Sequence, residues 1–476
     1  MNINDIGIIE ITDTPPPLDL KLEEIEALAD ELVDYHAEFA DLYYRVEQAH
    51  WGYKYLQGLM LPIEGKAIQP MAMALEGGDI QAMQQFIGQG QWQDEKLLKK
   101  HWQLVDETLG EDDGVWITDG SEFPKKGEYS VGVASQWCGR LGKVENCQRG
   151  VFAAYASRKG YTLLDRRLYL PEAWFDEEHR ERWKRCGIPD DTSFKTKPEL
   201  ALDMLKAAVA EGTLRFRWVA CDEDYGKDPA FLDGVADLEG CWYFAEVPHS
   251  TRVWETRPQT AVPEWSGRGR RPTQERLGPG EPKPQRVDKI AAAIPANEWK
   301  AYLIKEGSKG PLVAEFAFRR MVAVRDGLPG PEVWLVLRRS LDEEPELKTY
   351  LSNAPADTAH TELVRVTGMR WPVETAIEDG KDGLGMDDYM VRSWLGWHHH
   401  MTECILAHHF LVRVQKRLKR APALTIPQAR LLVASILPLK RLDPQEALDR
   451  VRLIQKQNHA AYLSHRKRTI KRLDAL

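Results

Sequence analysis

Residues 370–381 read RWPVETAIEDGK, a short apolar-periodic run in which a carboxylate is placed between two basic side chains. Pro372 suits the first turn of a helix, because the N–H that proline lacks would have no partner there. Glu374 then lies in that first turn, and Glu378 and Lys381 share its face four and seven residues further on. On spacing alone, an ion-pair ladder on a helix surface is the better interpretation of these residues. Whether Glu374 has a functional role therefore depends on the segments upstream.

The composition is that of a water-soluble chain with room for two or three domains. Of its 476 residues, 43% are hydrophobic and 29% are charged. No apolar run is long enough to cross a membrane, and the N-terminal stretch lacks the basic and apolar segments of a signal peptide. The six cysteines include no CxxC pair, which argues against a zinc cluster or a disulfide framework and suits a reducing cytoplasm.

Charge is distributed unevenly along the chain. From Val412 to Leu476 there are 16 Lys and Arg against 4 Asp and Glu, a net charge of +12. Because the whole chain carries −9, residues 1–411 carry −21. A basic end on an acidic body indicates a polyanionic partner, and the alternative is a solvated helix surface.

Two segments read as strands that deliver an acid at their end. Residues 114–120, GVWITDG, lead to Asp119, and residues 215–222, RFRWVACD, lead to Asp222. Further strands and the helical pattern KPELALDMLKAAVAEG lie between them, and a helix and the strand CWYFAEVP follow. Three antiparallel strands, a helix, a strand, a helix and a strand predict a mixed sheet flanked by helices.

Changes of pattern divide the chain into six regions. We predict a disordered lead, a helical module, the first part of an α/β or α+β core, a β-rich insertion, the second part of that core, and a basic helical end. Their ranges are 1–20, 21–110, 111–251, 252–345, 346–412 and 413–476. The insertion opens with a proline-rich loop and ends with two strands joined at residues 327–330 as a hairpin.

Asp119, Asp222 and Glu374 come from three separate elements and can converge at one edge of the sheet. Taken singly, each acid is better explained as a helix cap or a turn residue. Taken together, three carboxylates repel unless cations hold them, and oxygen ligands with open positions suit Mg²⁺ or Mn²⁺. Two such ions roughly 3.5 to 4 Å apart activate an attacking oxygen and stabilise a leaving one in phosphodiester displacement.

Arg370, Glu374 and Lys381 also keep the spacing of a family motif, which reads Tyr, two residues, Arg, three residues, Glu, six residues, Lys. The segments TDGSEFPKKGEYSVGVASQWCGRLGK, ACDEDYGKDP and RWPVETAIEDGKDGLGMDDYMVRSWLGWHHH are similar to the blocks around that family's three acids. The chain thus resembles bacterial insertion-sequence transposases of the cut-and-paste kind, which have a ribonuclease H-like DDE core with a β insertion. Thr367 departs from the motif's Tyr, and Gly120 stands where many relatives have a second acid.

The resemblance implies a role for each residue of this set. It implies that Asp119, Asp222 and Glu374 bind the metal ions, with Asp119 bridging both, and that Arg370 and Lys381 hold phosphates. The implied cofactor is Mg²⁺, with Mn²⁺ as a substitute. The sequence has no glycine-rich phosphate loop, so ATP is not implied.

Other side chains are candidates for DNA contacts. Lys125 and Lys126 lie in the turn after the first strand, where a solvated turn is the alternative. Trp334 resembles the family position whose indole stacks on a flipped base when hairpin ends form, and the alternative is a tryptophan packed in a strand. The loop GRGRR, residues 267–271, adds the basic side chains of Arg268, Arg270 and Arg271.

A run of histidines invites a metal interpretation that its geometry does not support. Consecutive histidines on one helix point in different directions and do not build one site. We therefore expect a structural or DNA-facing role for His398, His399, His400, His408 and His409.

The sequence and the resemblance together predict a Mg²⁺-dependent DNA transposase that cleaves DNA and transfers strands at transposon ends, by way of hairpin ends. The expected partners are the double-stranded DNA of the terminal inverted repeats and of the target, and a second copy of the chain in a synaptic complex. We expect the helical module to bind DNA and the protein to be cytoplasmic, at the bacterial nucleoid and not at a membrane. Two alternatives stay open: a DNA-binding protein descended from a transposase that does not cut, and a ribonuclease H-like nuclease without strand transfer.

Overall fold

The computed structural model describes residues 18–440, apart from residues 266, 268–269, 308–309 and 422–423, and a few residues beyond 443. Most of the predicted lead 1–20 and most of the basic end beyond residue 440 therefore lie outside the described residues. Within the described part, no helix is both long and apolar enough to cross a membrane. All six cysteines are buried and free.

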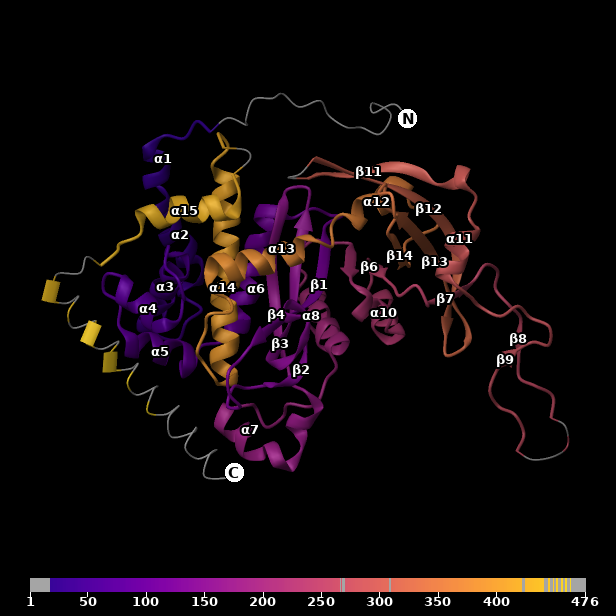
Figure 1. The fold of residues 1–476 in the computed structure, drawn as a ribbon, viewed down its shortest axis with the longest axis horizontal. Coiled ribbons are helices and arrows are strands. Elements are labelled where there is room, and N and C mark those ends of the chain that lie inside the picture. Colours follow the sequence, from indigo (N-terminus) through magenta and orange to yellow (C-terminus); the bar gives the residue numbers. More distant parts are fainter. Residues whose placement is uncertain are drawn as a thin grey trace.

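The first elements form the helical module that the 3.6-residue periodicity predicts. They are α1 (Leu22–Glu26), α2 (Leu28–Ala40), α3 (Val46–Met60), α4 (Ile68–Ala74), α5 (Ile80–Gly88) and α6 (Asp94–Leu109). Helix α2 buries Leu28, Leu32, Tyr35 and Phe39, which lie three or four residues apart on one face. The module packs against α14 (Trp394–Arg417) and α15 (Ile426–Ile436), and its helix α6 also lies directly against β4 of the sheet (Figure 1).

The central sheet has the predicted ribonuclease H-like arrangement. Its strands are β1 (Val115–Pro124), β2 (Ala134–Cys138), β3 (Lys143–Ser157), β4 (Gly160–Tyr169), β5 (Trp218–Cys221) and β6 (Trp242–Glu246). Strands β1, β3 and β4 pair antiparallel, whereas β5 pairs parallel with both β1 and β6. The helices along the crossovers are α7 (Arg180–Cys186), α8 (Lys197–Glu211), α9 (Glu223–Gly226) and α10 (Pro229–Ala236).

Most strands of the insertion extend the central sheet. The insertion contains β7 (Arg252–Trp254), β8 (Thr260–Ala261), β9 (Arg276–Leu277), β10 (Gln285–Arg286), α11 (Val287–Ala293), β11 (Lys300–Gly307), β12 (Gly310–Arg325) and β13 (Leu328–Arg339), and β14 (Leu347–Ser352) follows. Strands β8 and β9 pair only with each other. Because β14 pairs with both β13 and β6, the strand order runs β10-β7-β12-β13-β14-β6-β5-β1-β3-β2.

The predicted hairpin between β12 and β13 is confirmed. Its turn residues Asp326 and Gly327 have φ angles of 52° and 77°. Both angles lie in the left-handed region that a two-residue turn of type I′ requires, and this turn matches the twist of the flanking strands. The Asp-Gly pair thus fixes the register of the long hairpin that joins the insertion to β14.

The segment 370–381 begins as predicted and then departs from the α-helix. After α12 (His360–Thr367), helix α13 (Pro372–Glu378) starts at Pro372 with Glu374 in its first turn. Residues Asp379–Gly383 form a π-helical turn, so Lys381 does not continue the α-helical face of Glu374.

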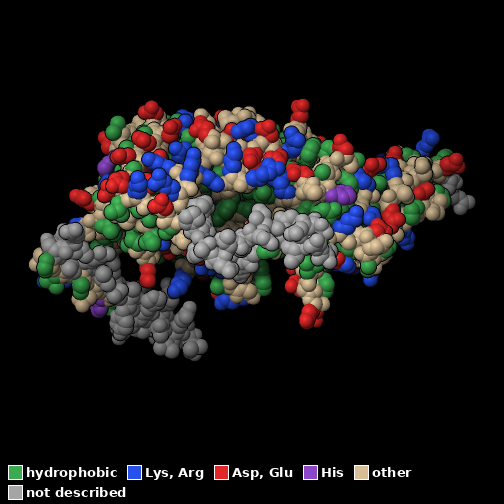
Figure 2. Space-filling view, turned by 90° about the horizontal axis from the view of Figure 1, so that it is seen from above, with side chains coloured by type: hydrophobic (Ala, Val, Ile, Leu, Met, Phe, Trp, Pro, Cys, Tyr) green, Lys and Arg blue, Asp and Glu red, His purple; other side chains and the backbone are tan. Residues whose placement is uncertain are grey.

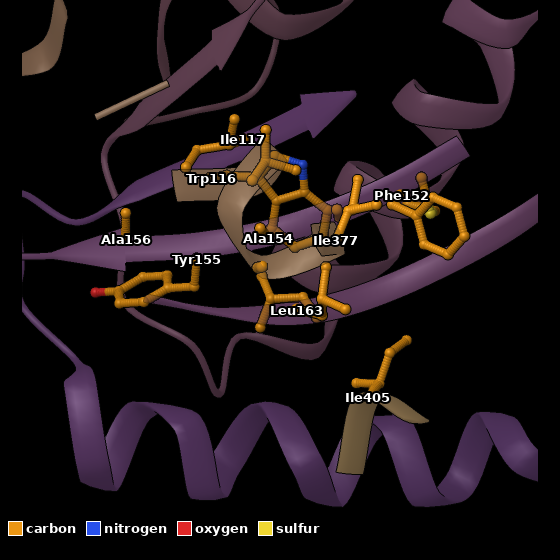
Figure 3. Packing of buried hydrophobic residues seen from close by; sticks show 14 of the residues in the cluster. Trp116, Ile117, Phe152, Ala154, Tyr155, Ala156, Leu163, Ile377 and Ile405 are labelled. Atoms are coloured by element: carbon orange, nitrogen blue, oxygen red, sulfur yellow. The ribbon is translucent and has the colours of Figure 1, made fainter. Parts of the chain in front are cut away.

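Buried side chains fix α13 and α14 to the strand that carries Asp119. One continuous core includes Trp116, Ile117, Ala154, Leu163, Ile377 and Ile405, which come from β1, β3, β4, α13 and α14 (Figure 3). Because packed interiors tolerate little displacement, the helix that bears Glu374 and the strand that bears Asp119 hold a constant separation.

The histidines of α14 are structural. All five of the run are at most 8% exposed, which excludes the DNA-facing alternative. The Nδ1 atom of His400 lies 2.8 Å from the hydroxyl of Tyr55, and that of His408 lies 3.0 Å from the hydroxyl of Thr162. These rings therefore tie α14 to the helical module on one side and to β4 on the other.

The buried rings predict that acid destabilises the fold. Burial lowers the pKa of His398 to about 3 and of His399 and His400 to about 4, against about 6.5 in an unfolded chain. As the pH falls from 7 to 5, only the unfolded chain takes up these protons, so the free energy of unfolding falls by up to ~2 kcal/mol per ring. We expect a lower melting temperature at pH 5 than at pH 7, measured by circular dichroism.

Glu403 titrates in the opposite sense and provides the control. Burial raises its pKa to about 8, so the folded state keeps a proton that the unfolded chain releases, and lowering the pH through this range stabilises the fold. The variant Glu403→Gln lacks this compensation and should lose more stability between pH 7 and 5 than the wild type. A melting temperature that stays constant or rises toward pH 5 in both proteins would contradict the neutral buried rings.

Candidate active site

Asp119 and Asp222 lie side by side at the end of the parallel pairing of β1 with β5. Thr118 is opposite Cys221 in that pairing, and each of these residues is followed directly by an acid. Asp222 is the N-cap of α9, and its carboxylate accepts a hydrogen bond from the N–H of Asp224 at 3.0 Å. The strand register thus places these two predicted ligands together.

Arg370 links Glu374 to two other acids of the site. Its Nη1 atom lies 2.7 Å from Oε1 of Glu374 and 3.9 Å from Oδ2 of Asp119. Its Nε atom lies 3.5 Å from Oε2 of Glu246, a fourth acid at the end of β6. One guanidinium, only 17% exposed, therefore faces three carboxylates from three elements.

The charge of this site is unbalanced toward the negative. Burial, and next the charge of Asp222, raise the pKa of Asp119 to about 7, although Arg370 and the N–H of Gly120 oppose the shift. Burial, and next the charge of Asp224, also raise the pKa of Asp222. A carboxylate that resists ionisation beside an arginine indicates a place where further positive charge would be stabilising.

Glu246 is the residue of this site that the sequence analysis missed. It is 8% exposed, and its Oε1 atom accepts a hydrogen bond from Nζ of Lys348 at 2.7 Å. A Cβ at Gly226 would lie 2.0 Å from the carbonyl oxygen of Glu246, so only glycine lets α9 approach β6 this closely. The signal was present in CWYFAEVP, which is a third strand that ends on an acid.

Tyr225 is a second missed residue. Its side chain is 2% exposed, and its hydroxyl has no hydrogen-bond partner within the described part of the chain. Burial, and next the charges of Asp119 and Asp222, hold its pKa well above the ordinary value. The hydroxyl lies 3.9 Å from the position of a Cβ on Gly120. Tyr225 therefore brings a protonated donor to the edge where the acids gather.

Lys381 and Lys125 are bonded within the protein and do not extend into solvent. Nζ of Lys381 donates to Oγ of Ser121 at 2.7 Å, which anchors the π-helical turn to β1. Nζ of Lys125 lies 3.3 Å from the ring centroid of Tyr389. The solvated-turn alternative therefore fits Lys126, which is exposed, and not Lys125.

Trp334 occupies a packed position. It is 7% exposed, and its indole Nε1 donates to the carbonyl oxygen of Pro355 at 2.9 Å. This environment fits the alternative of a tryptophan packed in a strand, because stacking on a base requires a free ring face. The exposed indole beside the acids is that of Trp371, which follows Arg370 and is 47% exposed.

The remaining candidates lie at the surface or outside the described residues. Arg270 and Arg271 are exposed, and Arg268 falls outside the described residues. Asp224, the acid closest in sequence to Asp222, is 55% exposed and pairs with Lys227 at 2.6 Å.

The acids are suited to a cation but do not yet enclose one. Within the described residues, no three acids, histidines or cysteines are already spaced to hold a metal ion. The guanidinium of Arg370, held by Asp119 and Glu374, is the cation present between them. An oxygen-only donor set of this kind suits Mg²⁺ or Mn²⁺ once the guanidinium moves aside.

Comparisons with known proteins agree with this geometry. The family model of the DDE superfamily endonucleases matches residues 38–311, which is more than half of the chain and includes Asp119 and Asp222. A protein of Microchaete diplosiphon, described as a probable transposase for insertion sequence element IS701, is 22% identical over 343 residues. That alignment covers 71% of this chain and 76% of the Microchaete protein. With its ribonuclease H-like sheet and with Asp119 and Asp222 where the pairing of β1 with β5 ends, the chain belongs to the DDE superfamily of endonucleases.

Proposed function

We propose that this DDE endonuclease is a DNA transposase that cleaves at transposon ends and joins the freed 3′-OH to another strand. The observation that carries the proposal is that the pairing of β1 with β5 places Asp119 beside Asp222, while Arg370 joins Asp119 to Glu374. The similarity to the Microchaete diplosiphon protein, a probable transposase, supports the finer assignment. The proposed substrates are terminal inverted repeats and target DNA, and the proposed assembly is a dimer of this chain.

We propose that Asp119, Asp222 and Glu374 hold divalent ions, Mg²⁺ or in its place Mn²⁺. Bound there, two such ions would polarise the phosphate and the attacking oxygen. Once their charge is neutralised, Asp119 and Glu374 no longer hold the Nη1 atom of Arg370, which becomes free to bind a phosphate oxygen. Glu246 still faces Nε and keeps the guanidinium at the site.

Two steps of the proposed reaction use the same groups. Water attacks one strand first, and the resulting 3′-OH then attacks the opposite strand or the target. The hydroxyl of Tyr225 would donate to an oxygen bound near Asp119, because a buried donor without a partner is costly. Lys381 would hold the π-helical turn against β1 while DNA occupies the edge.

The charge of the chain predicts which regions contact DNA. The module 21–110 carries 16 Asp and Glu against 7 Lys and Arg, a net charge of −9. Phosphate contacts need positive charge, so we propose that the module contributes few of them. We assign most of the phosphate contacts to the core, to the loop with Arg270 and Arg271, and to the basic end 413–476.

The acids can be tested by alanine substitution in the purified protein. Asp119→Ala, Asp222→Ala and Glu374→Ala should each abolish metal-dependent cleavage of DNA that carries the element's own ends, because each removes a metal ligand. Binding of the same DNA in a gel-shift assay should survive, since most contacts to phosphates lie elsewhere.

Asp224→Ala and Glu378→Ala are the matched controls and should keep most of the activity. Asp224 is held by Lys227 at the surface, and Glu378 is exposed. If Asp222→Ala were active and Asp224→Ala were inactive, the assignment of Asp222 as a metal ligand would be wrong. If the DNA were cut but never joined to target DNA, the protein would be a nuclease without strand transfer. If the wild type bound the ends without cutting them, it would be a transposase-derived DNA-binding protein.

Glu246→Gln should slow cleavage without preventing DNA binding. The substitution removes the charge that faces Nε of Arg370, so the guanidinium is less well held, and a charge-assisted contact of about 1.5 to 3 kcal/mol corresponds to roughly ten- to hundredfold in rate. Glu346→Gln is the control, because Glu346 also contacts Lys348, at 3.5 Å, but is 70% exposed. Equal rates for the two variants would exclude the positioning role.

Trp334→Ala should act through stability. Removal of a packed indole costs about 3 to 5 kcal/mol, so the melting temperature, nicking and hairpin formation should fall together. Trp371→Ala is the comparison, because its exposed ring can be removed with little loss of stability. A Trp334→Ala protein of normal stability that nicks but forms no hairpin would instead restore Trp334 as the base-stacking residue.

A further inference from the structure

The insertion places two cations, Lys305 and Arg338, on the same face of the sheet, because their partners Leu312 and Phe316 lie four residues apart on β12. Lys305 lies on β11 and Arg338 on β13, and burial followed by the charge of Arg338 lowers the pKa of Lys305. Among the described residues, no carboxylate lies within 4.0 Å of either side chain. Two like charges in a partly buried place are unfavourable until an anion joins them.

A β-bulge positions Lys305. The pairing of β11 with β12 shifts register between Leu303 and Lys305, and bulges redirect the side chains that follow them. A Cβ on Gly368 would lie 2.6 Å from Cγ2 of Ile304, so only a glycine after α12 leaves room for the bulge residue Ile304. Nζ of Lys305 consequently lies 5.8 Å from the ring centroid of Trp371, the residue next to the arginine of the acid site.

Arg338 reaches the same place from the sheet. It is directly opposite Lys348 on β14, so both side chains lie on one face. Lys348 bonds to Glu246, which faces Arg370. Lys348 and Glu246 thus connect Arg370 to the face of the sheet that carries Arg338, and Arg338 has no acidic partner within the described part of the chain.

The chemistry of this pair fits a phosphodiester backbone. A guanidinium binds phosphate oxygens through two parallel hydrogen bonds, and a lysine adds a point charge beside it. The molecule seen from above has Lys and Arg side chains gathered along a rim of the hollow on that face (Figure 2). We propose that Lys305 and Arg338 bind the phosphates of the DNA strand next to the scissile one, which rests on the proposed DNA-cleaving function and deepens it.

The test measures the salt dependence of DNA binding by the full chain. Fluorescein-labelled duplex and single-stranded oligonucleotides of arbitrary sequence are titrated with Lys305→Gln, Arg338→Gln and the double variant at several KCl concentrations. Each lost phosphate contact should reduce the slope of log affinity against log salt by about 0.9 for duplex or about 0.7 for a single strand, and the double variant by about twice that. The nucleic acid that shows the change identifies the strand form bound.

Arg339→Gln is the matched control. Arg339 follows Arg338 on the same strand but lies on the opposite face, where Nε bonds to Glu315 at 2.6 Å. It should keep the wild-type slope, and so should Lys305→Arg and Arg338→Lys, which retain the charge. If the Arg338 variants have a lowered melting temperature, the test rests on Lys305→Gln alone. The slope of log affinity against log salt for that variant must still fall by the value of one phosphate contact.

Two negative outcomes are distinguishable. A double variant with the slope of Arg339→Gln, in a protein whose wild type binds and cuts DNA, would overturn this inference alone. A wild type whose affinity for both oligonucleotides is independent of salt would overturn the proposed function as well, since a DNA-cleaving enzyme must contact phosphates.

Discussion

Mutual repulsion among carboxylates is the constraint on which the rest of this structure depends. The acids within β1, just after β5, at the end of β6 and at the start of α13 lie in one partly buried place, and Arg370 faces three of them. Taking charges out of water is costly unless they are paired, so the surrounding chain must hold the arginine in position. The raised pKa of Asp119, about 7, shows that one guanidinium does not neutralise the set. A fold that gathers more negative charge than it balances is prepared for added cations, and that is the property a metal-dependent phosphodiester reaction needs.

The sequence predicts those parts of the site that local rules control. A strand that leads to Asp119, another that leads to Asp222, and a helix that opens at Pro372 are each readable from a few neighbouring residues. The predicted end of the first strand was wrong, because β1 passes through Asp119 and pairs with β3 as far as Pro124. Glu246 was missed because a single acid after a strand has little meaning until the pairing of β6 with β5 and β14 places it beside Arg370. The direction of the Lys305 side chain could not be predicted at all, because it depends on a β-bulge. A bulge is set by the register between two strands, which no local pattern encodes.

Residue type was a poor guide to role wherever burial decides. Five histidines in one helix suggest a metal centre, yet they fill the contact between α14 and its neighbours, with the pKa of His398 lowered by burial to about 3. Trp334 satisfies its indole N–H on a backbone carbonyl inside the sheet, whereas Trp371 is exposed next to Arg370. The sequence identifies which aromatic and imidazole groups exist, but only the packing of long-range neighbours determines which of them reach solvent.

The continuity of the sheet links the insertion to the acids. An insertion joined by flexible linkers would carry its cations at variable distances from Asp119, but β14 hydrogen-bonds to β6 and thereby makes β12 and β13 part of the same ladder. Arg338 sits within that ladder, and Ile304, the residue before Lys305, packs against Gly368 at the end of α12, only a few residues before α13. A phosphate bound by this pair would therefore be fixed relative to Glu374 by backbone hydrogen bonds and packed side chains. Since positioning is the main contribution a protein can make to phosphoryl chemistry, a β insertion that continues the sheet would serve the proposed reaction by extending the rigid frame of the core.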